Sequence, residues 1–354
     1  MANIFDDWVR GESLGEGGQA WTYKAHNQND SERTVYVIKL LKHKSSANRL
    51  KRFEREIEAG RRLSHPNVVR FVDQNIQHVK PYVVMEYCSG RDLKSLNISQ
   101  LSLLEKLKMF WDVCKGVGHA HENGVIHRDL KPNNIFLRAD YRTPVVGDFG
   151  LCLLTELDER LTETTEAVGA RLYMAPELED GRYEDASPIA DVYSLGKILY
   201  WLVSNKRMFS REKHANEIYD LRREDQSAAM AFVYEILDDT IEAAPEKRKY
   251  SNASKLADAV ETIINRITVG AHAIKLEVSQ QCSYCGTGTY QIILDGDYQK
   301  VGFETRGYHL GISLKNVPGQ KWLILACDYC GNLQFFRADM AAKNPKAWTS
   351  ESNA

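Results

Sequence analysis

The chain has 354 residues, a formal net charge of −2, 43% hydrophobic residues and 27% charged residues. This length predicts two or three domains with buried cores, and the composition is typical of a globular protein rather than a disordered one. The charge gives no sign of a polyanion-binding protein. The N-terminus lacks a basic segment followed by an apolar one, so we expect no signal peptide. The most apolar run, Val192–Val203, contains Lys197 and falls short of the roughly 18 residues that a membrane span needs.

Residues 8–86 read as short β-type runs with one charged helix at 48–63. A glycine-rich stretch lies between two of these runs, where Gly15 and Gly17 allow backbone amides to approach phosphate oxygens. The alternating run Val35–Lys39 predicts a strand that ends in a lysine. Glu56 lies in the following helix and is a candidate partner for Lys39. The alternative is that Lys39 is an ordinary solvated charge on the surface.

Residues 101–266 show mainly helical periodicity, broken by polar loops. Two of these loops carry the residues with the clearest chemistry. Asp129 can accept the proton of an attacking hydroxyl, and Lys131 can neutralise charge on a transferred phosphoryl group. Asn134 and Asp148 offer oxygen ligands, which Mg²⁺ prefers. Phosphoryl transfer needs positioning and charge compensation more than covalent chemistry, and these residues supply both.

The segments His127-Arg-Asp-Leu-Lys-Pro-Asn-Asn134, Asp148-Phe-Gly150 and Ala175-Pro-Glu177 follow one another at a characteristic spacing. In this respect residues 8–266 resemble the eukaryotic-type protein kinase family. The resemblance implies an α+β, bilobal protein kinase fold, with a β-rich N-lobe at about 8–87 and a helical C-lobe at about 88–266. It also implies ATP and Mg²⁺, or Mn²⁺, as cofactors, and protein substrates. The lysine two residues after the catalytic aspartate resembles serine/threonine kinases.

The resemblance also assigns roles to individual residues. Lys39, Glu56, Asp129 and Lys131 would be catalytic, and Asn134 and Asp148 would bind magnesium. The nucleotide pocket would comprise Gly15, Glu16, Gly17, Gly18, Thr22, Val37, Lys39, Met85, Glu86, Cys88, Asp92 and Phe136. Met85 would be the gatekeeper, and the backbone of Cys88 rather than its thiol would face adenine. Asp191 would brace the catalytic loop, and Glu177 would pair with Arg248.

The sequence departs from the family pattern in the glycine-rich loop and in the helix of Glu56. Ala20 replaces a third glycine and Thr22 replaces a valine, for which we expect modest effects on nucleotide affinity. Gly60 lies one helical turn after Glu56, where relatives carry leucine or a similar residue. Glycine costs about 1 kcal/mol of helix propensity relative to alanine, which predicts a mobile helix in the resting enzyme. The alternative is that Phe71 fills the space.

The segment between Asp148 and Glu177 contains Thr162, Thr164 and Thr165. In the family, the arginine equivalent to Arg128 often meets a phosphate on this segment, so these threonines are candidate regulatory sites. Alternatively they supply only loop polarity. Ala170 stands where serine/threonine kinases usually carry a threonine that bonds the catalytic residues. This departure removes one of the features that are typical of the serine/threonine class.

Residues 267–281 resemble a linker, residues 282–337 form a β-rich segment, and residues 338–354 a polar tail. Two near copies, Cys282-Ser-Tyr-Cys285-Gly and Cys327-Asp-Tyr-Cys330-Gly, resemble the knuckles of a zinc ribbon. The four cysteines predict one structural Zn²⁺ ion. A redox pair or four buried thiols are the alternatives. Such paired cysteines also favour a cytoplasmic protein over a disulfide-bonded one.

Two classes of function compete for the whole chain. The first is an active protein kinase, which the complete set of catalytic residues favours. The second is a pseudokinase-like scaffold that binds a protein partner through the zinc-ribbon-like domain. Nucleic acid is not expected as a partner, because residues 282–337 contain five Lys or Arg and four Asp or Glu. No membrane association is predicted.

Overall fold

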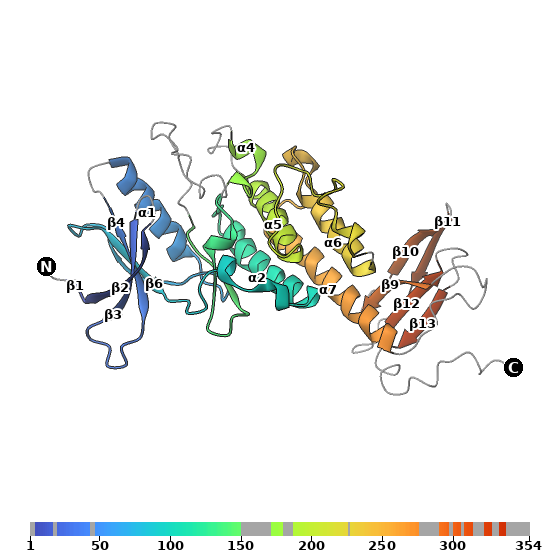
Figure 1. The fold of residues 1–354 in the computed structure, drawn as a ribbon, viewed down its shortest axis with the longest axis horizontal. Helices are drawn as coiled ribbons and strands as arrows, with labels where there is room; N and C mark the ends of the chain where they lie inside the picture. Colours follow the sequence, from blue (N-terminus) through green and yellow to red (C-terminus); the bar gives the residue numbers. More distant parts are fainter. Residues whose placement is uncertain are drawn as a thin grey trace. The chain divides into compact units, whose positions relative to one another are not determined.

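The computed structural model describes residues 4–16, 20–42, 47–149, 171–179, 187–225 and 227–275, with strands at 290–296, 300–305, 308–313, 322–327 and 333–337. The chain divides into two compact units, Met1–Val260 and Glu261–Ala354 (Figure 1). Among the described residues, no helix is both long and apolar enough to cross a bilayer.

The first unit begins with an antiparallel six-stranded sheet in the order β1-β2-β3-β4-β6-β5. Its strands are β1 (Ile4–Phe5), β2 (Trp8–Glu16), β3 (Ala20–Asn27), β4 (Tyr36–Leu41), β5 (Phe71–Asn75) and β6 (Tyr82–Glu86). Helix α1 (Ala47–Arg62) packs on one face of it (Figure 1). Side chains alternate along β4, so Ile38 and Leu40 join the core of the other face. Lys39 therefore points to the face that α1 covers.

Strand β1 extends the sheet beyond the predicted start of the domain at residue 8. The carboxylate of Asp6 accepts a hydrogen bond from the Tyr82 hydroxyl at 2.6 Å and another from the Asn75 amide at 2.8 Å. Phe5 is buried against Trp8 and Tyr82 in the sheet core. These long-range contacts involve residues whose order along the chain does not reveal that they meet.

The helical part of the first unit contains α2 (Leu103–Glu122), α4 (Pro176–Glu179), α5 (Pro188–Val203), α6 (Ala228–Thr240) and the start of α7 (Ala253–Lys275), which continues past Val260 into the second unit. Short 3-10 helices lie at η1 (Leu93–Ser95), η2 (Ile98–Gln100), η3 (Pro132–Asn134), η5 (Leu221–Arg223) and η6 (Pro245–Lys247). A capping box between Ser102 and Glu105 begins α2. Helix α5 lies beside α2 and α6 (Figure 1) and is buried on every side from Ala190 to Val203. A helix with apolar residues all round its circumference is expected in such a central position.

A small hairpin of β7 (Ile135–Leu137) and β8 (Pro144–Val146) follows α2 in the chain and packs against both the sheet core and α2. Val146 forms a parallel bridge with Val68, and Phe136 forms an antiparallel bridge with Asp92. Residues 127–134 enter this hairpin and residues 147–149 leave it. The antiparallel pairing therefore brings the two chemically distinctive segments side by side.

Strands β9 (Tyr290–Gly296), β12 (Trp322–Cys327) and β13 (Leu333–Arg337) form a three-stranded sheet in the order β13-β12-β9. Strands β10 (Lys300–Thr305) and β11 (Tyr308–Ser313) form a separate pair. A β-rich segment was predicted here. Helix α7, in contrast, continues to Lys275, past Arg266 and into the predicted linker. No proline interrupts residues 267–275, so each further residue adds a backbone hydrogen bond to the existing helix.

Candidate active site

Lys39 and Asp148 are 109 residues apart in the chain and form a direct ion pair. The Lys39 Nζ lies 3.0 Å from Oδ1 of Asp148, and Lys39 is only 5% exposed. Burial raises the pKa of the Asp148 carboxyl, but the charge and hydrogen bond of Lys39, together with the nearby His127 and Lys131, bring the pKa below its ordinary value. Asp148 is therefore an ionised carboxylate, the kind of ligand that a hard divalent cation binds.

Two neighbouring side chains hold the carboxylate of Asp129. Lys131 Nζ donates to its Oδ2 at 2.7 Å, and Asn134 Nδ2 donates to the same oxygen at 3.0 Å. Asn134 Nδ2 also donates to the backbone oxygen of Asp129 at 2.7 Å. Because the amide nitrogen of Asn134 faces Asp129, its Oδ1 is the atom that can bind a metal. The structure thus brings three of the predicted site residues into direct contact.

Asp191, in the first turn of α5, braces the loop that carries Asp129, as the resemblance predicted. Its carboxylate accepts hydrogen bonds from the backbone amides of His127 and Arg128, both at 2.8 Å. A third contact, at 2.9 Å, comes from Nε2 of His121 on α2. Burial raises the pKa of Asp191, but these bonds, above all that of His121, bring it below its ordinary value. Arg128 has a φ of 67°, a strained backbone conformation that the hydrogen bonds from the His127 and Arg128 amides to Asp191 stabilise.

The rings of Phe149 and His127 pack against each other at an interplanar angle of 55°. Their ring centroids are 4.8 Å apart, and His127 Nε2 lies 2.8 Å from the backbone oxygen of Gly147. At Gly60 on α1, a Cβ atom would come within 2.5 Å of the Phe71 ring. Phe71 therefore fills the space that a larger side chain at position 60 would take. This contact supports the packing alternative for Gly60 rather than an empty, mobile position.

The predicted nucleotide-binding residues lie along neighbouring strands. Thr22 pairs with Lys39 across β3 and β4, and Val37 pairs with Met85 across β4 and β6. The Thr22 hydroxyl donates to the backbone oxygen of Gly15 at 3.1 Å. These register positions bring the glycine-rich strand, the strand of the lysine and the gatekeeper strand together, as a nucleotide pocket between them requires.

Glu86, the last residue of β6, is bonded within the protein. Its carboxylate accepts from the backbone amide of Arg70 at 3.0 Å and pairs with Arg138 at 3.1 Å, and its own amide donates to the backbone oxygen of Arg70 at 2.9 Å. Burial raises the pKa of the Cys88 thiol to about 11, which keeps the thiol protonated. Asp92 caps η1 through a 2.8 Å bond from the Ser95 amide. Its role toward a ribose stays a prediction.

Glu177 and Arg248 form the predicted ion pair. The two guanidinium nitrogens lie 2.6 and 2.8 Å from the two carboxylate oxygens of Glu177. Arg248 also donates to the backbone oxygens of Ile189, Glu242 and Ala243. The pair therefore fastens α4 to the helical part of the unit with the two-pronged geometry that makes arginine–carboxylate bonds strong.

Several predicted positions lie outside the described residues. They are Gly17, Gly18, the side chain of Glu56, Thr162, Thr164, Thr165, Ala170, Cys282, Cys285 and Cys330. Cys327 ends β12, where only the backbone is described. In the described parts of the chain, no group of three or more His, Cys, Asp or Glu side chains is arranged to hold a metal ion. The zinc site and the pairing of Glu56 with Lys39 stay predictions.

Two residues of the site region were missed by the sequence analysis, His121, which bonds Asp191, and Arg138, which bonds Glu86. A third residue, Lys197, was not assigned a role and lies outside the site, buried inside α5. Only Lys197 gave a signal in the sequence, as the one charge within the otherwise apolar run Val192–Val203. The partners of His121 and Arg138 are distant in the chain, and no local pattern announces them.

A strand lysine bonded to one aspartate, beside a second aspartate held by a lysine and an asparagine, defines a phosphotransferase site of the protein kinase type. The protein kinase domain model matches residues 8–273, and the chain belongs to this family. A probable serine/threonine-protein kinase of Clostridium acetobutylicum is 29% identical over 266 residues, which cover 72% of this chain and 39% of that protein. Serine/threonine-protein kinase PknB of Mycobacterium tuberculosis is 30% identical over 232 residues, or 63% and 36% of the two chains.

A cell cycle serine/threonine-protein kinase of Saccharomyces cerevisiae is 32% identical over 218 residues, which cover 60% of this chain and 30% of the yeast protein. In all three comparisons the matched part is less than two fifths of the relative's length. The similarity therefore concerns the kinase domain and not the remainder of those proteins.

Proposed function

We propose that the protein transfers the γ-phosphate of ATP to serine or threonine hydroxyls of protein substrates. The observation that carries this proposal is the Asp129 carboxylate, bonded by Lys131 and Asn134 next to the Lys39–Asp148 pair. The printed names of the bacterial and yeast relatives support the serine/threonine class.

The residues fit a magnesium–nucleotide complex. Asp148 contributes a carboxylate whose pKa is held low, and Asn134 contributes an amide oxygen, so both ligands are the hard oxygens that Mg²⁺ prefers. When bound, the ion supplies positive charge that offsets the charge of the phosphates. Lys39 adds a second positive charge beside Asp148. Asp129 receives the proton of the substrate hydroxyl, while Lys131 keeps the carboxylate in place and balances charge on the phosphoryl group in transit.

The hydroxyl class can be tested directly. We expect the purified protein, with labelled ATP, Mg²⁺ and casein, to label serine and threonine in phosphoamino-acid analysis. Chelation of Mg²⁺ should abolish the labelling, and Mn²⁺ should restore it. Label found only on tyrosine would contradict the class, and no label on casein, on a cell extract or on the protein itself would contradict the activity. The scaffold alternative is not favoured, because the catalytic side chains that the structure describes are present and mutually bonded.

We also propose that the protein phosphorylates its own activation segment, the residues between Asp148 and Glu177. Arg128 directly precedes Asp129, and a phosphate on Thr162, Thr164 or Thr165 would offer it a charge-assisted partner that orders the segment. Mass spectrometry of the active protein should find phosphate on at least one of these threonines. Full activity of a protein without phosphate at all three would contradict the proposal.

For the C-terminal unit we propose a structural zinc site formed by Cys282, Cys285, Cys327 and Cys330, and a role in docking a protein partner. Two C-x-x-C pairs match the common spacing of structural zinc ligands. Four sulfur ligands leave no open position on the ion, so the metal would be structural. Reduced cysteines in such pairs also favour a cytoplasmic location.

A further inference from the structure

Lys197 carries a buried amine at the centre of the apolar helix α5. It is 0% exposed, and its Nζ donates to the backbone oxygens of Phe209 at 2.8 Å and Arg211 at 3.0 Å. The same nitrogen lies 3.6 Å from the centroid of the Phe209 ring. Burial lowers the pKa of Lys197 to about 7, even though the Glu212 carboxylate raises it. Burying an amine is costly unless its hydrogen bonds are satisfied, and here the two backbone oxygens accept them.

The contacts of Lys197 lead toward the end of the activation segment. By holding the backbone at 209 and 211, Lys197 places Glu212, which accepts a 3.0 Å hydrogen bond from the Tyr193 hydroxyl. The Tyr193 ring lies 4.9 Å from the guanidinium carbon of Arg248. Arg248 in turn binds both carboxylate oxygens of Glu177. These contacts connect α5, through residues 209–212, to residues 171–179.

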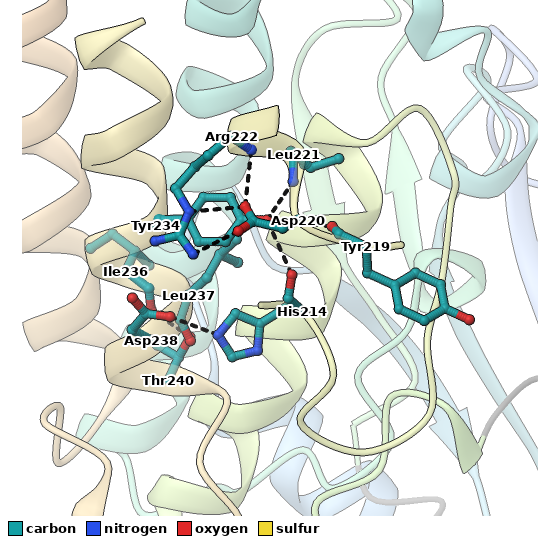
Figure 2. A network of polar contacts seen from close by, with 10 residues as sticks. All are labelled: His214, Tyr219, Asp220, Leu221, Arg222, Tyr234, Ile236, Leu237, Asp238 and Thr240. Atoms are coloured by element: carbon teal, nitrogen blue, oxygen red, sulfur yellow. Dashed lines mark hydrogen bonds and ion pairs between the residues drawn. The ribbon is translucent and has the colours of Figure 1, made fainter. Parts of the chain in front are cut away.

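The remainder of the segment that carries Glu212 is anchored independently (Figure 2). On α6, Asp238 pairs with Nε2 of His214 at 2.8 Å, and the Tyr234 hydroxyl accepts from the Leu221 amide at 2.7 Å. The Tyr234 hydroxyl also lies 3.2 Å from the backbone oxygen of His214. Removing the Lys197 amine should therefore loosen residues 209–212 without releasing the whole loop from α6.

We propose that Lys197 is a positioning residue for the protein substrate, acting through Glu212 and Tyr193 on the Arg248–Glu177 pair. The segment ending at Glu177 starts at Asp148, so it leads from the phosphoryl-transfer site into the helical part. This inference rests on the proposed protein kinase function. The nucleotide side is held by other contacts, those of Asp191 and Lys39, and does not depend on Lys197.

The first test compares Lys197→Met, which keeps a long apolar side chain but no donor, with Lys115→Met. Lys115 is a matched control on α2, because its ammonium also lies 3.6 Å from an aromatic ring and pairs with a carboxylate, that of Asp112. We expect Lys197→Met to raise the KM for casein about tenfold, since small misplacements of a substrate are costly. The KM for ATP and the rate of ATP hydrolysis to water should stay within about twofold of wild type, because other contacts hold the nucleotide side. A uniform change in all these constants would indicate general damage to the protein.

The second test is amide hydrogen exchange, which needs no substrate. Exchange of residues 171–179 should be faster in Lys197→Met and in Glu212→Gln, while exchange of residues 127–134 is unchanged. Glu212→Gln removes the charge at a partly exposed position and serves if Lys197→Met does not fold. Unchanged exchange at 171–179 in both variants, or a parallel rise in both KM values, would overturn the inference. A wild-type protein that transfers no phosphate would instead contradict the proposed function, whereas hydrogen exchange tests the link from Lys197 to residues 171–179 independently of that function.

Discussion

Asp191 is fully buried, and its carboxylate receives two backbone amides and one imidazole. A buried charge of this kind is stable only while its partners remain, and its partners here belong to the loop that carries Asp129. The stability of the fold and the geometry of the site therefore depend on the same group. The resemblance to the kinase family implied this brace, although Asp191 is more than 60 residues from the loop, but it gave no sign of His121.

Replacing Asp191 with alanine should destabilise the protein by about 3–5 kcal/mol, the usual result of removing one partner from a buried charged network. Urea unfolding at neutral pH measures this loss. Asp140→Ala is the control, since Asp140 also accepts two backbone amides, at 2.8 and 2.9 Å, but is exposed. The control should lose about 1 kcal/mol. Equal losses in the two variants would show that burial of Asp191 is not what matters.

The lowered pKa values of Asp148 and Asp191 predict how stability depends on pH. A carboxyl whose pKa is lower in the folded state contributes stability above its unfolded pKa of about 3.9 and loses it as pH falls toward the folded value. The free energy of unfolding should therefore decrease below about pH 4. The decrease should be shallower in Asp191→Asn, measured by urea unfolding across pH 3–7. An identical pH profile in that variant would contradict the assignment.

Helix α1 and strand β5 meet at Gly60 and Phe71, and here the structure decides between two predictions. The sequence shows a glycine where a large residue is usual, which by itself predicts a gap. Phe71 closes the gap from a neighbouring strand, a contact that depends on how the sheet and the helix pack. Local propensity could predict that α1 exists but not what covers its face.

Exchanging the two side chains tests this packing. Gly60→Ala alone should destabilise the protein by about 1–3 kcal/mol, because the new Cβ forces the Phe71 ring to move. This outcome opposes the gain in helix propensity. The pair Gly60→Leu with Phe71→Ala should recover stability relative to Gly60→Leu alone. Thermal unfolding and phosphotransfer rates measure both effects. A stabilising Gly60→Ala would favour the mobile-helix interpretation instead.

The boundaries of elements were predicted less well than their identities. The strand of Lys39 and the helix of Glu56 follow from alternation and from the charged helical pattern, and both are found at β4 and α1. The extension of α7 to Lys275 was missed, since no strong stop signal marks the predicted end at residue 266 or the observed end at residue 275. Strand β1 was missed because two residues carry too little pattern, and its stability comes from Asp6 and Tyr82.

At the scale of the whole molecule, the chain has two compact units, and the zinc site is predicted for the second of them. Protein purified without added metal should contain about one equivalent of zinc, and a variant with Cys327→Ser and Cys330→Ser should contain much less. Because zinc binding supplies folding free energy to small domains, removing zinc with a chelator and then assaying with excess Mg²⁺ should leave residues 282–337 unfolded and largely spare phosphotransfer. Elemental analysis measures the zinc content, circular dichroism measures the unfolding, and the casein assay measures phosphotransfer. Less than a tenth of an equivalent of zinc in a folded unmodified protein would exclude the site.

The proposed phosphoryl transfer depends most on Asp129 as its base. The direct test compares wild type with Asp129→Asn for transfer of labelled phosphate from ATP to casein, with ADP affinity measured by calorimetry in parallel. The variant should lose about 10²–10⁴-fold in turnover, the usual contribution of a positioned base, and bind ADP as wild type does. Equal turnover of the two proteins, at equal ADP affinity, would contradict the account.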